Sequence, residues 1–302
     1  MAGAPATWRG YLQLAPLVIK DVRADLNQKL GEGSFGIVYK AVLHNGMEAA
    51  AKQLNSFDSR DISKFVNECQ LMKSISEENS NYIVRFFGVY FDETSHPPSA
   101  SLHTEPPPQL IMELMEASVY DCISPTPPKK RFVTLNRVTI TEILLNVAQG
   151  LNVMHCNQLV HRDLNPGNVL LKKSNDSGVH VTAKISDFGL SRRILGTERD
   201  LTKCPGCFCF MPPEAILGSN YNEKIDIYSF GVLALYMVTE ELPPFPQPPF
   251  DEPSARESLP VIKTDELFPL IERCLAKRHD FRPTAAEAAE FLSHKRKFET
   301  VS

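Results

Sequence analysis

The sequence lacks an apolar segment long enough to cross a bilayer, which takes about 18 residues. Its longest apolar run, around residues 227–238, is interrupted by Ser229 and Gly231. Residues 1–10 also lack the basic flank and the apolar core that a signal peptide carries. We therefore expect neither a membrane span nor secretion.

The composition also lacks a strong charge of either sign, because the formal net charge of the 302 residues is -4. A mildly acidic chain gives no reason to expect nucleic-acid binding. The seven cysteines are odd in number and scattered, which is typical of reduced thiols and predicts a cytoplasmic location. Cys204 and Cys207 are spaced like a zinc-binding pair, but no second pair lies nearby to complete four ligands, so ordinary thiols are favoured.

Hydrophobic spacing divides the chain into a strand-rich and a helix-rich part. Residues 26–113 are mostly strand-like, and 48–54 is a predicted strand. One helix is predicted there over 61–76, with Asp58 or Asp61 as its cap. Its apolar stripe consists of Phe65, Cys69, Met72 and Ile75. Three proline clusters predict loops, at 97–108, 125–128 and 243–253.

Beyond residue 135 the pattern is helical. The clearest helix carries an apolar stripe made of Ile140, Ile143, Leu144, Val147, Leu151 and Met154. A buried helix is predicted over 227–238, and surface helices over 266–276 and 284–293. A strand-rich half joined to a helix-rich half predicts an α+β fold of two lobes with a cleft between them.

A glycine-rich segment lies between two predicted strands, with glycines at 31, 33 and 36. Backbone without side chains can approach phosphates closely and offer N–H donors to them. A plain glycine hairpin is the alternative. A dinucleotide-binding turn needs a helix directly after the glycines, whereas residues 37–42 continue as a strand, so we reject that reading.

Lys52 stands on an otherwise apolar strand, where its ammonium group needs an anionic partner. A surface lysine is the alternative. Glu68 lies beside the apolar stripe of the 61–76 helix and can point inward. We therefore predict a Lys52–Glu68 pair that holds the ammonium towards nucleotide phosphates.

A second group of polar residues follows the stripe helix. Asp163 lies in the segment 161–168, Asn168 ends that segment, and Asp187 follows 24 residues after Asp163. Residues 169–171 and 181–185 are predicted to form a hairpin between them. Phosphoryl transfer needs a carboxylate to orient the attacking hydroxyl, which Asp163 can supply, and oxygen ligands for magnesium, which Asn168 and Asp187 can supply. Each acid alone could merely cap a turn, but their order and spacing together favour a kinase.

These motifs resemble the eukaryotic protein kinases over residues 26–295. The resemblance implies a two-lobed fold, with a β-rich N-lobe that carries one regulatory helix and an α-rich C-lobe. The expected segments are an N-terminal extension 1–25, the N-lobe 26–112, the hinge 113–116, the C-lobe 117–295 and a tail 296–302. It also implies transfer of the γ-phosphate of ATP, bound with Mg²⁺, to a hydroxyl group of a protein substrate.

The resemblance assigns roles to individual residues. The expected catalytic residues are Asp163, Lys52, Glu68, Asn168 and Asp187, of which Asn168 and Asp187 hold the metal. Met112 would be the gatekeeper, and Glu113 and Met115 would lie in the hinge that binds adenine. The expected ATP-binding residues are Leu30, Gly31, Gly33, Ser34, Phe35, Gly36, Val38, Ala50, Lys52, Met112, Glu113, Met115 and Leu170. A regulatory spine is expected from Met72, Phe86, His161 and Phe188, and an ion pair from Glu214 and Arg282.

Two positions depart from the family pattern. Asn165 stands where serine/threonine kinases usually have the lysine that helps neutralise the γ-phosphate. Cys207 stands where they usually have a threonine that bonds the catalytic aspartate, and its thiol predicts only a loose link to Asp163. Pro166 nevertheless favours serine or threonine over tyrosine as the acceptor. A pseudokinase scaffold and a small-molecule kinase are the alternatives; the presence of Lys52, Asp163 and Asp187 and of the Pro213-Glu214 element argues against them.

Regulation by an upstream kinase is expected on the segment 187–214. Arg162 precedes the catalytic aspartate, and an arginine there can pair with a phosphate on that segment. The candidate acceptors are Ser191, Thr197 and Thr202.

Overall fold

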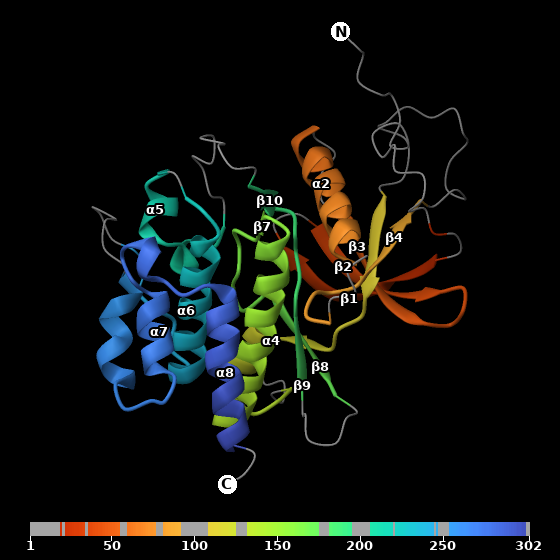
Figure 1. The fold of residues 1–302 in the computed structure, drawn as a ribbon. Helices are drawn as coiled ribbons and strands as arrows, with labels where there is room; N and C mark the ends of the chain where they lie inside the picture. Colours follow the sequence, from red (N-terminus) through yellow and green to blue (C-terminus); the bar gives the residue numbers. More distant parts are fainter. Residues whose placement is uncertain are drawn as a thin grey trace. The chain divides into compact units, whose positions relative to one another are not determined.

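The computed structural model describes residues 19, 22–33, 36–54, 59–76, 81–91, 108–124, 132–174, 181–194, 206–219, 221–244, 246 and 254–299. The chain has an α+β fold and divides into two compact units (Figure 1). We call Met1–Asn79 with Val84–Met115 the N-terminal unit, and Ser80–Ile83 with Glu116–Ser302 the C-terminal unit.

The N-terminal unit contains a five-stranded antiparallel sheet with the strand order β1-β2-β3-β5-β4. Its strands are β1 (Val22–Gly33), β2 (Gly36–Leu43), β3 (Glu48–Leu54), β4 (Phe86–Tyr90) and β5 (Gln109–Glu113). The predicted strand 48–54 is confirmed as β3. The turn between β2 and β3 contains Gly46 with a φ of 80°, a conformation that glycine adopts without steric cost.

The two faces of this sheet differ because side chains along a strand alternate between them. One face forms a buried cluster of Val22, Ala41, Leu43, Ala49, Ala51 and Ile111. The register pairs Val38 with Lys52 across β2 and β3, and Ala50 with Met112 across β3 and β5. Alternation therefore places these four side chains together on the other face.

Helix α2 (Ser59–Ser76) lies beside the sheet in the N-terminal unit. The predicted helix is confirmed, and its stripe residues Phe65, Cys69, Met72 and Ile75 are all buried. The predicted cap is wrong in one respect. The helix already begins at Ser59, so Asp61 lies inside it, while Asp58 falls outside the described residues.

The C-terminal unit is built on α4 (Arg137–Cys156), which lies beside α6 (Lys224–Thr239) and α8 (Ala285–Glu299) (Figure 1). Asn136 caps α4, since its side chain accepts a hydrogen bond from the Thr139 N–H. The six stripe residues predicted for this helix are all buried. In α6 the buried residues run without a break from Ile225 to Met237, which explains why the sequence pattern there is continuous and not amphipathic.

Two predicted surface helices differ from the structure in length. Helix α7 (Phe268–Cys274) is shorter than 266–276, whereas α8 extends beyond 284–293 to Glu299. Thr284 precedes α8 and forms a capping box: its hydroxyl accepts from the Glu287 N–H, and the Glu287 carboxylate accepts from the Thr284 N–H.

Shorter elements complete the C-terminal unit. A three-stranded sheet has the order β6-β8-β9, and the predicted hairpin is its antiparallel β8–β9 pair. The shorter elements are α3 (Val119–Ile123), α5 (Pro213–Ile216), β6 (Ala117–Ser118), β7 (Leu159–Val160), β8 (Val169–Lys173), β9 (Val181–Ile185), β10 (Arg192–Arg193) and the 3₁₀ turns η2 (Phe208–Phe210), η3 (Ser254–Ile262) and η4 (His279–Phe281).

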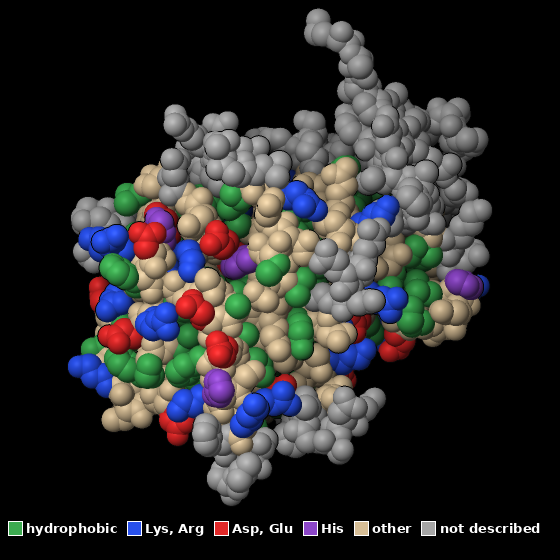
Figure 2. Space-filling view, viewed as in Figure 1, with side chains coloured by type: hydrophobic (Ala, Val, Ile, Leu, Met, Phe, Trp, Pro, Cys, Tyr) green, Lys and Arg blue, Asp and Glu red, His purple; other side chains and the backbone are tan. Residues whose placement is uncertain are grey.

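The surface of the described residues carries charges of both signs. Figure 2 shows acidic and basic side chains intermingled over the helices of the C-terminal unit. None of the helices in the described part of the chain has the length and hydropathy needed to cross a bilayer. The three predicted proline loops fall mostly outside the described residues.

Candidate active site

Lys52 and Glu68 meet in the interior of the N-terminal unit. The Lys52 Nζ lies 2.8 Å from Glu68 Oε1 and 3.0 Å from Oε2, and both residues are buried. Strand β3 supplies the lysine, and α2 supplies the glutamate from the position before the buried Cys69. The predicted pair is therefore formed, and the two charges compensate each other at a position where either alone would be costly.

The three glycines lie within the paired ends of β1 and β2, whereas the sequence predicted a segment between the strands. A side chain at Gly36 would place its Cβ 2.3 Å from the Gln53 carbonyl oxygen, so the close approach of β2 to β3 requires glycine there. A Cβ at Gly31 would meet nothing within 4 Å, so its backbone borders open space. Leu30 is half exposed beside it. Gly33 ends β1, whereas Ser34 and Phe35 lie outside the described residues.

The other expected ATP-binding residues are distributed over both units. Val38, Ala50 and Met112 share the Lys52 face of the N-terminal sheet, as the register shows. The Glu113 N–H donates to the Arg85 carbonyl, 2.9 Å away, and Met115 is the last residue of the N-terminal unit. Leu170 lies on β8 in the C-terminal unit, opposite Ser118 on β6.

The Asp163 carboxylate is held at both oxygens. Its Oδ2 accepts a hydrogen bond of 3.0 Å from Asn168 Nδ2, and its Oδ1 accepts one of 2.8 Å from the Cys207 backbone N–H. Asn168 Nδ2 also donates to the Asp163 carbonyl. Burial raises the pKa of Asp163, and the Cys207 N–H offsets part of that rise. The carboxylate is thus oriented and more basic than an ordinary aspartate.

Asp226 fixes the backbone of the catalytic segment. Its buried carboxylate accepts from the backbone N–H groups of His161 and Arg162, at 2.8 and 2.9 Å, and from His155 Nε2 at 2.9 Å. Burial alone would raise the pKa of Asp226, but the hydrogen bond and charge of His155 leave it lowered. Arg162 has a positive φ of 72°, a strained conformation that these bonds stabilise.

The sequence pattern did not single out Asp226 as a site residue. The residues 226–231 resemble the start of the buried central helix of the protein kinases, but an acid there is equally well explained by a carboxylate next to the helix N-terminus. The structure shows that it supports the segment carrying Asp163 through the two residues before it.

The segment around Asp187 lies against the same loop. The Ser186 N–H donates to the Asn168 carbonyl, and His161 Nε2 donates to the Ser186 carbonyl, both over 2.9 Å. Phe188 is buried and contacts the His161 ring edge to face, with centroids 5.5 Å apart. Asp187 itself has a positive φ of 61°. Two expected spine residues thus touch within the C-terminal unit; the other two, Met72 and Phe86, are buried in the N-terminal unit.

Asn168 and Asp187 fit a magnesium ion by their chemistry. With the Asn168 amide nitrogen bound to Asp163, its oxygen and the Asp187 carboxylate offer the hard donors that Mg²⁺ prefers. Among the described residues there is no group of three His, Cys, Asp or Glu that could hold a metal. Magnesium commonly binds one or two protein oxygens and takes its remaining ligands from phosphates and water. Cys204, of the alternative zinc pair, lies outside the described residues.

Both departures from the family pattern differ in geometry from what the sequence suggests. The Asn165 side chain folds back into its own loop, donating to the Asp163 carbonyl and accepting from the Gly167 N–H at 3.0 and 2.9 Å. It therefore shapes the loop, whereas the lysine that is usual at this position helps to neutralise the γ-phosphate. The predicted loose thiol link from Cys207 is wrong, because a short bond from its backbone N–H joins it to Asp163.

The predicted pair of Glu214 and Arg282 is present. Arg282 Nη2 lies 3.0 Å from Glu214 Oε2, and Nη1 bonds Oε1. Ser191, a predicted phosphorylation site, is buried, and its hydroxyl donates to the His161 carbonyl. An upstream kinase cannot reach Ser191 in this conformation, whereas Thr197 and Thr202 lie outside the described residues.

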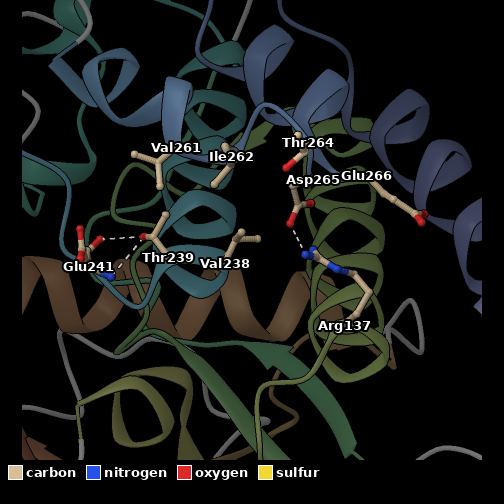
Figure 3. Close-up of a pocket in the computed structure, with 9 residues that line it drawn as sticks. All are labelled: Arg137, Val238, Thr239, Glu241, Val261, Ile262, Thr264, Asp265 and Glu266. Atoms are coloured by element: carbon tan, nitrogen blue, oxygen red, sulfur yellow. Dashed lines mark hydrogen bonds and ion pairs between the residues drawn. The ribbon is translucent and has the colours of Figure 1, made fainter.

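A cavity of about 480 Å³ lies at the N-terminal end of α4 (Figure 3). Its wall includes Val238 and Ile262, and an ion pair between Arg137 and Asp265 crosses one side. Asp163 follows the opposite end of this 20-residue helix, which is roughly 30 Å long. The cavity is therefore separate from the catalytic segment.

The N-terminal unit holds a buried lysine–glutamate pair and a glycine-rich β-hairpin. The C-terminal unit holds an oriented aspartate and oxygen donors for a hard cation. Together these features are those of a nucleotide-dependent phosphotransferase. The chain matches the model of the protein kinase domain over residues 24–295. It belongs to the protein kinase family, whose domain is an ATP-dependent phosphotransferase.

The chain is similar to several serine/threonine-protein kinases. It is 32% identical over 279 residues to serine/threonine-protein kinase hippo of Drosophila melanogaster, covering 88% of this chain and 37% of that protein. It is 32% identical over 240 residues to receptor-like serine/threonine-protein kinase SD1-7 of Arabidopsis thaliana, covering 76% of this chain and 26% of that protein. A probable serine/threonine-protein kinase of Dictyostelium discoideum is 30% identical over 221 residues, covering 72% of this chain and 21% of that protein. The chain thus spans between about a fifth and two fifths of the length of these relatives.

Proposed function

We propose that this chain transfers the γ-phosphate of ATP to serine or threonine hydroxyls of a protein substrate. The observation that carries the proposal is the Asp163 carboxylate, oriented through both of its oxygens. A pseudokinase scaffold would not need that orientation together with a buried Lys52–Glu68 pair. Serine or threonine is favoured because the similar proteins are named for that activity and because Pro166 follows Asn165.

In the proposed mechanism Asp163 accepts the proton of the attacking hydroxyl, for which it must be ionised. A pKa raised by burial makes it a better base than an exposed aspartate. Glu68 orients the Lys52 ammonium for the phosphates, and Asn168 and Asp187 would hold the metal. Magnesium, bound together with ATP, supplies neutralisation of the phosphate charge.

The assignment of the remaining ATP-binding residues, the domain boundaries predicted from the sequence and a cytoplasmic location stay predictions. The N-terminal strands carrying residues 30–38 and the face carrying Ala50 and Met112 support the first of these.

The test is phosphopeptide mapping after incubation with a degenerate peptide library and magnesium ATP, with Asp163→Asn as the control protein. We expect phosphoserine and phosphothreonine that depend on Asp163. Products bearing phosphotyrosine alone would overturn the acceptor assignment. ATP binding without any phosphopeptide would instead support the pseudokinase alternative.

A further inference from the structure

We propose that the backbone N–H of Cys207 is a positioning group that aims the Asp163 carboxylate at the acceptor hydroxyl. The proposal rests on the proposed function, since it assigns how the catalytic base is oriented. In the family pattern that the sequence resembles, a threonine whose hydroxyl bonds the catalytic aspartate is usual at this position. Here the side chain is a thiol, a weak donor, and the main chain makes the bond instead, over 2.8 Å.

Gly206 permits the main chain to come this close. A Cβ at this position would lie 2.5 Å from the Arg162 carbonyl oxygen and 3.0 Å from Asp163 Oδ1. Backbone atoms of the catalytic segment cannot move aside cheaply, because Asp226 holds the Arg162 N–H. Any side chain at 206 would therefore push the next residue, and its N–H, away from the carboxylate.

The position of this N–H is fixed from the other side by α6. The Cys207 carbonyl accepts from the Phe210 N–H at 2.9 Å, which closes the η2 turn. The Phe210 carbonyl in turn accepts from the buried Ser229 hydroxyl at 2.8 Å. The N–H therefore belongs to a braced turn, and its direction is set before a substrate arrives.

The bond matters because it complements the one from Asn168. A carboxylate held at Oδ2 alone can still rotate about its Cβ–Cγ bond, and a second donor at Oδ1 removes that freedom. Neither donor is charged, so the carboxylate is oriented while remaining basic enough to accept a proton.

A single substitution can remove the Cys207 backbone N–H selectively. Cys207 has a φ of -68°, which matches the φ that the proline ring imposes. Cys207→Pro therefore removes the donor with little change in backbone direction, and the preceding glycine has no Cβ to clash with the proline ring. Cys207→Ala removes the thiol but keeps the N–H, and is the matched variant.

We expect Cys207→Pro to have a kcat about 10- to 100-fold below that of Cys207→Ala, because one bond to a charged group is lost. The KM for ATP should differ less than about twofold between them, since the bond concerns the acceptor side. The KM for the acceptor peptide should also change less than kcat, because the bond orients the base and does not bind the peptide. A melting temperature equal to that of Cys207→Ala separates this loss from a folding defect.

Crystal structures of both variants show the orientation of the Asp163 carboxylate without turnover. A carboxylate that is rotated about its Cβ–Cγ bond in Cys207→Pro but not in Cys207→Ala supports the proposal even if the wild-type chain phosphorylates no peptide, in which case only the proposed function fails. An unchanged carboxylate in Cys207→Pro, or in a chain that phosphorylates the peptide a kcat equal to that of Cys207→Ala, would overturn the positioning role. If Cys207→Pro does not fold, Gly206→Ala takes its place. It should lower kcat relative to Cys207→Ala and rotate the Asp163 carboxylate in the same way, and an unchanged carboxylate would overturn the proposal.

Discussion

Arg282 is a buried cation that joins several segments of the C-terminal unit. Its side chain is fully enclosed, and its guanidinium uses all of its N–H groups. Besides the bidentate pair with Glu214, it donates to three backbone carbonyls, those of Ala276, Lys224 and Lys277, over 2.9 to 3.3 Å. The guanidinium also lies 5.0 Å from the ring centre of Tyr228.

Replacing this side chain by methionine, which is similar in length, removes every one of these bonds. Glu214 then loses its cation, and three carbonyl groups lose a donor in the interior. Removing one partner of a buried pair costs about 3–5 kcal/mol of unfolding free energy. For a unit of this size each kcal/mol lowers the melting temperature by about 2–4 °C, so we expect a fall of about 6–20 °C.

The assay is thermal unfolding followed by circular dichroism, with Arg278→Met as the matched control. Arg278 also pairs with an acid, Asp280, but both side chains are more than half exposed. An exposed pair contributes at most about 1 kcal/mol, so this control should melt close to the wild type. The double variant Glu214→Leu with Arg282→Met should recover part of the loss, because the largely enclosed carboxylate that has lost its cation is then also gone.

Equal melting temperatures for Arg282→Met and Arg278→Met would refute the reasoning, because they would show that burial adds nothing to the pair. A double variant less stable than Arg282→Met would refute the claim that the unpaired Glu214 charge is the source of the cost.

The other expectations concern catalysis. Lys52→Met should abolish phosphate transfer in single-turnover assays, and transfer near the wild-type rate would contradict the role of Lys52. Because Glu68 then stays buried without its partner, the same variant should lower the unfolding free energy of the N-terminal unit by about 3 kcal/mol. Adding Glu68→Leu should restore stability but not transfer. Asp163→Asn should slow single-turnover transfer about 10²–10⁴-fold while an ATP titration stays unchanged. In the wild type, transfer should decline on acidification through a pKa above the usual aspartate value of about 4, since burial raises the Asp163 pKa and only the ionised form accepts a proton; a limb at or below that value would contradict the assignment.

Much of the fold could be predicted because its signals are local. The stripe of α4 and the apolar strand β3 depend on residues close together in the chain, and the structure places them as expected. Element ends were less predictable, as at α2, where the helix starts two residues early. A helix end depends on capping and packing, which the apolar stripe does not report.

The Lys52–Glu68 contact could be predicted because a lone charge on a buried strand requires a partner, and one acid lay on the correct side of the neighbouring helix. The Cys207 contact could not be predicted in the same way. A side-chain comparison shows only that threonine is replaced by cysteine, and it suggests a weaker bond. The actual donor is a backbone N–H, which every residue except proline carries, so residue type holds no information about it.

The same reasoning explains how the catalytic aspartate is prepared within one unit. Its orientation depends on Cys207, 44 positions away, and the loop that carries it depends on Asp226, 64 and 65 positions from the two N–H groups that it binds. All of these groups lie in the C-terminal unit, whereas the Lys52–Glu68 pair is complete within the N-terminal unit. Each half of the proposed machinery is therefore assembled by contacts internal to its own unit. It follows that Cys207→Pro should slow transfer without breaking the Lys52–Glu68 pair, and that Lys52→Met should leave the bond between the Cys207 N–H and Asp163 in place.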